Sequence, residues 1–187
     1  ERINPTAWTD PHDAFYVDSG ITYSGSATST ITGLSHLVGE TVQVLGDGAN
    51  LGTFVVDGSG QIDLGSLTVQ KAQVGLKYTS RFKPMKFDND TIAGNSQGQR
   101  KQLNKVDITV RESMAVKVLD DKSSEIAIKW RDFVDFTDTA VPLRTGVISA
   151  RVRSFPTDDP YYTIVQDEPF PTTILAVNTR YEITEPI

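Results

Sequence analysis

Residues Thr41–Leu64 read TVQVLGDGANLGTFVVDGSGQIDL, and this stretch decides the fold class. Short runs of apolar and β-branched residues alternate with turn sequences at Asp47-Gly48 and Asp57-Gly58. Asp-Gly supplies the positive φ that a tight hairpin turn needs. The pattern therefore predicts a β-hairpin followed by a third short strand, with the strands at 41–45, 51–56 and 61–64.

The remainder of the chain continues this alternation. A period of two recurs about every ten residues, whereas helical periodicity is almost missing, so we expect an all-β protein. Asp18-Ser19-Gly20 predicts a turn, and the polar residues 88–101 predict a loop. The last strand is long and is expected to bend or bulge near Asn178. Further strands are predicted at 14–18, 28–32, 106–110, 114–118, 126–130, 148–152, 162–166 and 172–183.

The predicted organisation nests one β-domain inside another. Five short strands between turns predict a small β-barrel or sandwich over residues of about 24–70, and we take the barrel as the expected form. The strand-like stretches on either side, 15–23 and 73–85, are expected to be neighbours in a host sheet, which makes the barrel an insertion. The predicted parts are an extended lead-in at 1–13, a host β-domain at 14–23 and 71–187, and the inserted barrel at 24–70.

Composition argues against several classes of protein. The 187 residues are 38% hydrophobic and 22% charged, as in a folded chain. No run approaches the roughly 20 apolar residues of a membrane-spanning helix, and no signal peptide is expected. The absence of cysteine excludes disulfides, thiolate nucleophiles and Cys-ligated zinc. The net charge of −6 disfavours tight contact with the phosphate backbone of a nucleic acid.

The two histidines are the first candidates for site chemistry. His12 lies between Asp10 and Asp13, an arrangement that allows a metal site, but a solvated turn after a proline is the expected role. His36 lies within Gly33–Leu37, where a structural role is expected. Ser96 completes a catalytic triad with these histidines only by assumption. The sequence contains no Gly-x-Ser-x-Gly elbow, Walker loop or dinucleotide fingerprint, and we predict no catalytic, cofactor or metal site.

Acidic stretches offer no better site. Asp88-Asn89-Asp90 resembles the start of a calcium loop, but Ala93 and Gln99 occupy the positions where an EF-hand has Gly and Glu. Asp120-Asp121-Lys122 and Asp158-Asp159-Pro160 are expected to be turns, because Asp and Pro favour turns for backbone reasons. Nothing in the sequence places two of these carboxylates across one cleft, as a paired-carboxylate hydrolase needs.

Basic and aromatic residues form small clusters. Lys and Arg residues on strands are expected to pair with acids on neighbouring strands or subunits, and contact with DNA is the alternative. Strand residues two apart share one face, so Arg151 and Arg153 are expected to point the same way. The aromatic cluster is expected to pack in the core, with a helical turn or a partner-binding patch as alternatives. The basic residues concerned are Arg100, Lys101, Lys105, Arg151 and Arg153, and the aromatic residues are Trp130, Phe133 and Phe136.

Five segments, in chain order, resemble one protein family. They are Ala14–Tyr23, Gly33–Leu45, Val74–Ser80, Asn104–Arg111 and Ile164–Val177. In this order they resemble the C-terminal part of the nozzle, or tail tubular, proteins of short-tailed bacteriophages. The inserted barrel also resembles, in fold only, the first catalytic cysteine half-domain of ubiquitin-activating enzymes. A first residue of Glu1 fits a piece of a longer subunit.

The resemblance implies a virion structural protein of the phage tail and no enzymatic activity. It implies a homo-oligomer, a hexameric ring, around a lumen through which DNA passes in transit. Other tail proteins, such as the adaptor and the fibres or spikes, are the implied partners, and no cofactor is implied. A receptor-binding or carbohydrate-binding β-domain of a fibre or spike is the alternative. A hydrolase and a capsid-decoration or head-completion protein also stay open.

Overall fold

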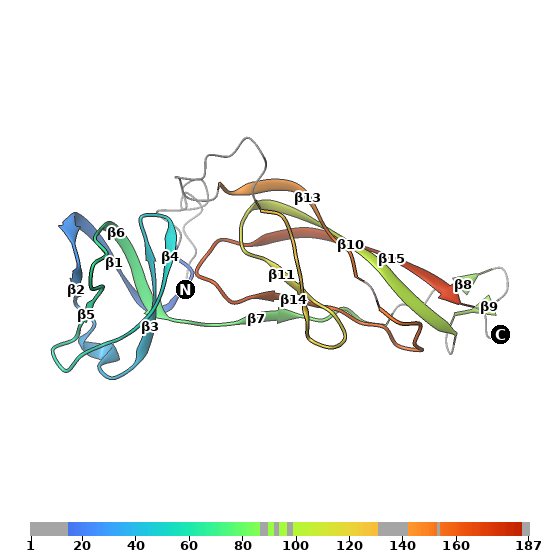
Figure 1. Ribbon diagram of the computed structural model, residues 1–187, viewed down its shortest axis with the longest axis horizontal. Coiled ribbons are helices and arrows are strands. Elements are labelled where there is room, and N and C mark those ends of the chain that lie inside the picture. The colour runs from blue at the N-terminus through green and yellow to red at the C-terminus, as the bar shows by residue number, and fades with distance from the viewer. Residues whose placement is uncertain are drawn as a thin grey trace. The chain divides into compact units, whose positions relative to one another are not determined.

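A computed structural model describes residues 15–86, 90–91, 94–96, 99–130, 142–152 and 154–184 (Figure 1). Antiparallel strands and one short 3-10 turn, η3 (Ser35–Leu37), make up its regular structure, with no α-helix among these residues. The all-β prediction is therefore confirmed. The described residues fall into two compact units. The first runs to Thr79 and includes Asp167–Pro171, and the second holds the rest from Ser80 onward, apart from the Pro142-Leu143 pair.

The first unit is built on a four-stranded sheet with an apolar core on one face. Val42 and Val44 alternate along one strand and are fully buried in this core, together with Val74 of its neighbour. A two-stranded ribbon completes the unit, and the pairing gives an open sheet rather than a closed barrel. The sheet order is β1 (Asp18–Thr28), β6 (Val69–Leu76), β3 (Thr41–Gly46) and β4 (Ala49–Val55), and the ribbon pairs β2 (Thr30–Thr32) with β5 (Gln61–Asp63).

The hairpin predicted from Asp47-Gly48 is confirmed. Asp47 has φ 47° and Gly48 has φ 78°, and both positive values suit the tight turn between β3 and β4. The Asp47 carboxylate also accepts the backbone N–H of Lys71 at 2.9 Å, which ties this turn to β6. Asp57 begins the second predicted turn, but the residue with positive φ there is Gly60, at 73°.

The predicted turn at Asp18-Ser19-Gly20 is wrong, because β1 begins at Asp18 and runs through it. Ser19 has φ 48°, and the β1–β6 register shifts between Asp18 and Ile21, so the irregularity is a β-bulge. Gly20 is needed for close approach of two strands. A Cβ there would lie 2.6 Å from the carbonyl oxygen of Val74.

The pairing of β6 differs from the predicted nesting. β6 lies between β1 and β3, with Leu76 opposite both Asp18 and Val42. The strand residues of the stretches assigned to the host domain, 18–23 and 71–76, therefore share a sheet with the proposed insertion. The boundary between the two units lies after Thr79, and β7 (Ser80–Phe82) begins the second unit. Periodicity alone could not reveal this, because it marks strands without their partners.

The segment Asp167–Pro171 belongs to the first unit although its flanking strands belong to the second. Two successive side-chain hydrogen bonds hold this segment to the sheet, on the face opposite the apolar core. Gln43, only 3% exposed, donates from Nε2 to the Asn50 side-chain oxygen at 2.9 Å. The Asn50 amide donates in turn to Glu168 at 3.4 Å. Polar residues are therefore buried on the face for which alternation predicts exposure to water.

The second unit is a sandwich of two antiparallel sheets that share one core. Val106 and Ile108 of one sheet and Val118 of the other are all fully buried in the same cluster, with Tyr162 and Ile164. The first sheet has the strand order β13 (Arg144–Ala150), β10 (Arg100–Ser113) and β15 (Thr173–Thr184). The second has the order β12 (Glu125–Ile126), β11 (Lys117–Leu119), β14 (Thr163–Gln166) and β7.

The strands of the second unit depart from the predicted ones at irregular positions. The predicted bulge on the last strand lies at Leu175 rather than Asn178, because Thr109 pairs with Ala176 and the next residue of β10 pairs with Ile174. A short backbone hairpin, β8 (Asp90–Thr91) with β9 (Gly94–Asn95), lies in the predicted loop over 88–101. Residues 88–89, 92–93 and 97–98 of that loop lie outside the described residues.

Candidate functional site

One face of the sheet β13–β10–β15 carries a group of polar side chains. Val106 and Ile108 point into the core, so the alternate residues Lys105, Asp107 and Thr109 point outward from the central strand. We call the side of the sheet that bears them the outer face. β10 positions it because this strand pairs with both neighbours.

Asp107 is the centre of a charged cluster on the outer face. Lys105 Nζ lies 2.8 Å from Asp107 Oδ1, and the Ser149 hydroxyl donates to the same carboxylate oxygen. The hydrogen bond from Lys105 lowers the pKa of Asp107 most, followed by the bond from Ser149, and the charges of Lys105 and Arg180 act in the same direction. A lowered pKa makes this carboxylate a weaker base. Lys105 thus pairs with an acid, but this acid lies two residues along the same strand rather than on a neighbouring strand or subunit as predicted.

Three basic residues form a row across the outer face. Lys105 is opposite Arg180 of β15 in the register. On the other side Val106 is opposite Ala150, so the antiparallel register places Arg151 beside Lys105. Arg151 and Arg180 are exposed. We call Arg151, Lys105 and Arg180 the basic row.

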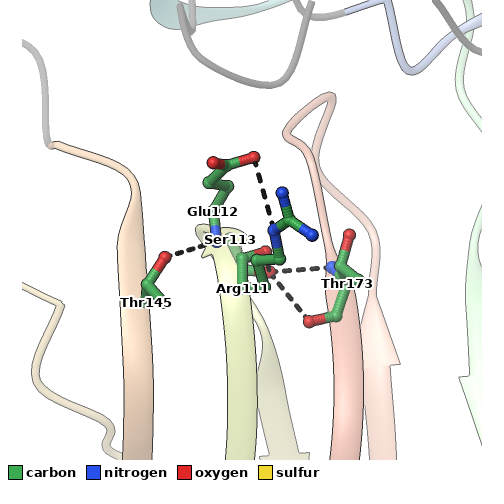
Figure 2. A network of polar contacts seen from close by, with 5 residues as sticks. All are labelled: Arg111, Glu112, Ser113, Thr145 and Thr173. Atoms are coloured by element: carbon green, nitrogen blue, oxygen red, sulfur yellow. Dashed lines mark hydrogen bonds and ion pairs between the residues drawn. The ribbon is translucent and has the colours of Figure 1, made fainter. Parts of the chain in front are cut away.

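A second polar network lies at the end of β10 (Figure 2). Ser113 is fully buried, and its hydroxyl donates to the Arg111 carbonyl at 2.7 Å and accepts the Thr173 N–H at 2.7 Å. On the other side, the Thr145 hydroxyl accepts the Glu112 N–H at 2.9 Å. The side chains of Ser113 and Thr145 therefore link β10 to β15 and to β13 at the point where the regular backbone pairing stops.

Backbone strain explains why this network is needed. Glu112 has φ 44° and Ala115 has φ 61°, in the left-handed region that non-glycine residues rarely adopt. The β10–β13 register also shifts between Val110 and Ser113. The predicted alternation from 106 to 118 is therefore broken here, and Lys117–Leu119 forms a strand of the other sheet. The hydroxyl of Ser113 supplies a partner for backbone that the irregular ladder leaves without one.

Replacement of Ser113 by alanine is expected to lower the free energy of unfolding by about 1–3 kcal/mol, because the part-buried Thr173 N–H loses its acceptor. The matched control is Thr145→Ala, since the exposed Glu112 N–H can bond to water instead, and it should change stability by less than about 0.5 kcal/mol. Urea denaturation of both variants measures the difference. Equal effects of the two changes would contradict the assigned role of Ser113.

Neither network is arranged for acid–base catalysis. Ser113 bonds to backbone atoms, and the Ser149 hydroxyl bonds to a carboxylate whose pKa is lowered. A nucleophilic serine needs a base that takes up its proton near neutral pH, usually histidine. The contacts of these two hydroxyls support roles in strand pairing and charge pairing.

The other predicted residues lie apart from these networks. The His36 ring bonds through Nε2 to the Ser19 carbonyl at 2.7 Å, a contact that supports its expected structural role. Asp120 accepts the backbone N–H of Ser124 at 2.7 Å, which confirms the predicted turn. Lys101, predicted in a basic cluster with Arg100, is instead only 4% exposed. Trp130 packs against the core of the second unit, as expected.

Two further predicted residues, Arg100 and Asp159, lie near side chains of opposite charge. Arg100 lies 4.0 Å from Asp158, and Asp159 lies 3.1 Å from Lys86. Ser96 is buried. Several predicted residues lie outside the described residues, so their predictions stay open: Asp10, His12, Asp13, Asp88, Asn89, Phe133, Phe136 and Arg153.

Comparisons with known proteins add no assignment. No family model matches this sequence, and no curated protein matches it. Within the described part of the chain, no group of three or more His, Asp or Glu side chains is placed to hold a metal ion. The same residues include no helix long and apolar enough to cross a membrane.

Proposed function

We propose that this chain is a structural subunit of the tail of a short-tailed bacteriophage, part of the nozzle or tail tube through which the genome leaves. In this proposal it is a virion protein without enzymatic activity. It assembles as a hexameric ring and contacts the adaptor and the fibres or spikes, while DNA meets it only in transit. A net charge of −6 suits a conduit, since it offers DNA few attractive phosphate contacts.

The observation that carries the proposal is where the five resembling segments lie in the fold. The first three contribute to β1, β3 and β6, which are neighbours in one sheet. The last two contribute to β10 and β15, which are also neighbours. Segments far apart in the sequence are therefore brought together in pairs of strands, as expected if they specify one shared architecture.

Native mass spectrometry of the full-length subunit tests the proposal. We expect a closed ring of six copies, because a rotational ring needs head-to-tail contacts that close. Electron microscopy of the same sample should show a continuous lumen. Only monomers or dimers at micromolar concentration would contradict the proposal.

Exposed aromatic side chains favour a second candidate, a receptor-binding or carbohydrate-binding domain. Phe155 is 73% exposed and Phe82 is 50% exposed, whereas aromatic side chains are usually more buried. The ammonium of Lys122 lies 5.1 Å from the centre of the Phe155 ring. Pull-down of host surface polysaccharide by the wild-type chain, lost on Phe155→Ala, would favour this candidate over the conduit.

A further inference from the structure

The two units carry opposite net charges. The described residues of the first unit include seven Asp or Glu and two Lys, for a net charge of −5. Those of the second unit include thirteen Lys or Arg and nine Asp or Glu, for a net charge of +4. The chain as a whole is acidic, so its positive charge is concentrated in one unit. Complementary charge of this kind orients the association of two molecules.

The basic row is the part of the second unit best suited to receive an acidic partner. Asp107 offsets Lys105, but neither Arg151 nor Arg180 forms an ion pair with a carboxylate of the described residues. Glu182, two residues beyond Arg180 on β15, is the other acid near the row. An arginine presents a planar fork of donors that matches a carboxylate, so this row can bind acids with defined geometry.

Apolar side chains extend the same face. Val147 is 57% exposed and follows the row toward the start of β13. The bulged residue of β15, Leu175, is 61% exposed. Exposed apolar residues beside charged ones are typical of protein–protein interfaces, in which an apolar centre is rimmed by polar groups. The outer face therefore has the composition of a docking surface for a protein.

The first unit gathers acids at one end of its sheet. Glu40 precedes β3, and its carbonyl accepts the N–H of Val56, next to Asp57. Asp18 begins β1, opposite the last residue of β6, at the same end. The side chains of Asp18 and Glu40 are exposed. This end carries the carboxylates of Asp18, Glu40 and Asp57, and the exposed Lys77, which directly follows β6, offsets one of their charges.

We propose that the outer face of one copy docks the acidic end of the first unit of a second copy. The contact joins unlike surfaces, so the first copy keeps its acidic end free and the second keeps its outer face free for further copies. Such a heterologous contact is the type that closes into rings. This inference rests on the proposed ring-forming function and names the surfaces that would make the ring.

Charge reversal in the full 187-residue chain tests this contact. Wild-type self-association should weaken as salt rises, because ions screen exposed charges. The double variant Arg151→Glu/Arg180→Glu should weaken self-association roughly tenfold or more. The acidic-end variant Asp18→Lys/Glu40→Lys should do the same. Sedimentation velocity measures each dissociation constant, and circular dichroism verifies that every variant is folded.

An equimolar mixture of the two double variants is the decisive sample. In the mixture each altered surface meets an altered partner of opposite charge, so association should return to near the wild-type level with the two variants alternating. The control Arg81→Glu/Lys86→Glu makes the same change in net charge on β7 and the segment that follows it, away from the outer face, and should leave association unchanged. Arg151→Lys/Arg180→Lys keeps the charge and should retain most of the association.

Several results would overturn the proposed contact. A wild-type chain that stays monomeric at high micromolar concentration in low salt overturns it. So does self-association that the reversals leave unchanged, and in that case the ring proposal survives with different surfaces. If Arg151→Glu/Arg180→Glu abolishes binding to a short DNA duplex but leaves self-association unchanged, the basic row binds nucleic acid instead. Association through these residues that stops at a two-fold dimer supports the contact and contradicts the ring.

Discussion

Replacing Tyr162 with alanine is expected to lower the free energy of unfolding by about 3–5 kcal/mol, the range seen when a large buried aromatic side chain is truncated. Tyr162 is 1% exposed and lies in the core shared by both sheets of the second unit. Its hydroxyl is 2.9 Å from the Thr179 hydroxyl. Chemical denaturation measures the loss, and a variant within about 1 kcal/mol of the wild type would contradict this account of the core.

Tyr162→Phe separates the ring from its hydroxyl and should cost only about 1 kcal/mol, the net value of one hydrogen bond. Burial raises the pKa of Tyr162, while its bond to Thr179 lowers it slightly in return. The unfolded tyrosine therefore ionises first. The contribution of protonated Tyr162 to the stability of the fold is complete below pH 10.0, the ordinary pKa of tyrosine. This contribution is lost as the pH rises through the pKa of Tyr162 in the folded state. This alkaline loss should be smaller in Tyr162→Phe.

The second large effect is expected at Gly75, where valine should cost about 3 kcal/mol or more. A Cβ at Gly75 would lie 2.7 Å from the Asp18 carbonyl oxygen and 2.7 Å from the Gly20 Cα. Both atoms belong to backbone, so the clash is relieved only if β1 and β6 separate. Thermal unfolding should show a midpoint lowered by about 6–12 °C, at the shift per kcal/mol typical of this chain length.

Gly58 provides the matched control for Gly75. A Cβ at Gly58 meets no atom within 4 Å, and its φ is not in the positive range. Gly58→Ala should therefore change stability by less than about 0.5 kcal/mol. If Gly75→Val also has no effect, the close approach of β1 and β6 is wrong.

Local chemistry made the hairpins predictable from sequence. Asp47-Gly48 fixes a turn through its own backbone preferences, and the strands on either side follow from alternation. Partners between distant strands carry no such local signal. The contact between Gly20 and Gly75 depends on the pairing of β1 with β6, which the sequence does not reveal. The composition of Asp18-Ser19-Gly20 alone therefore predicts a turn at Gly20.

The candidate site shows the same limit. Lys105, Arg151 and Arg180 are isolated basic residues in the sequence, and only the register of three strands places them in one row. Ser113 gives no signal either, because a serine at a strand end is common and its burial follows from the bulge beside it. Sequence reasoning identified Lys105 and Arg151 as basic residues but missed Arg180.

The crossing of Asp167–Pro171 into the first unit has a consequence for how this architecture can be inherited. Recombination within the gene at the codon for Thr79 would transfer β1 to β6 without the Glu168 side chain that bonds to Asn50. The recombinant sheet would then lack a piece encoded far downstream. The two units are therefore expected to descend together as one hereditary block, and a chimera joined at that boundary would leave Asn50 without this partner.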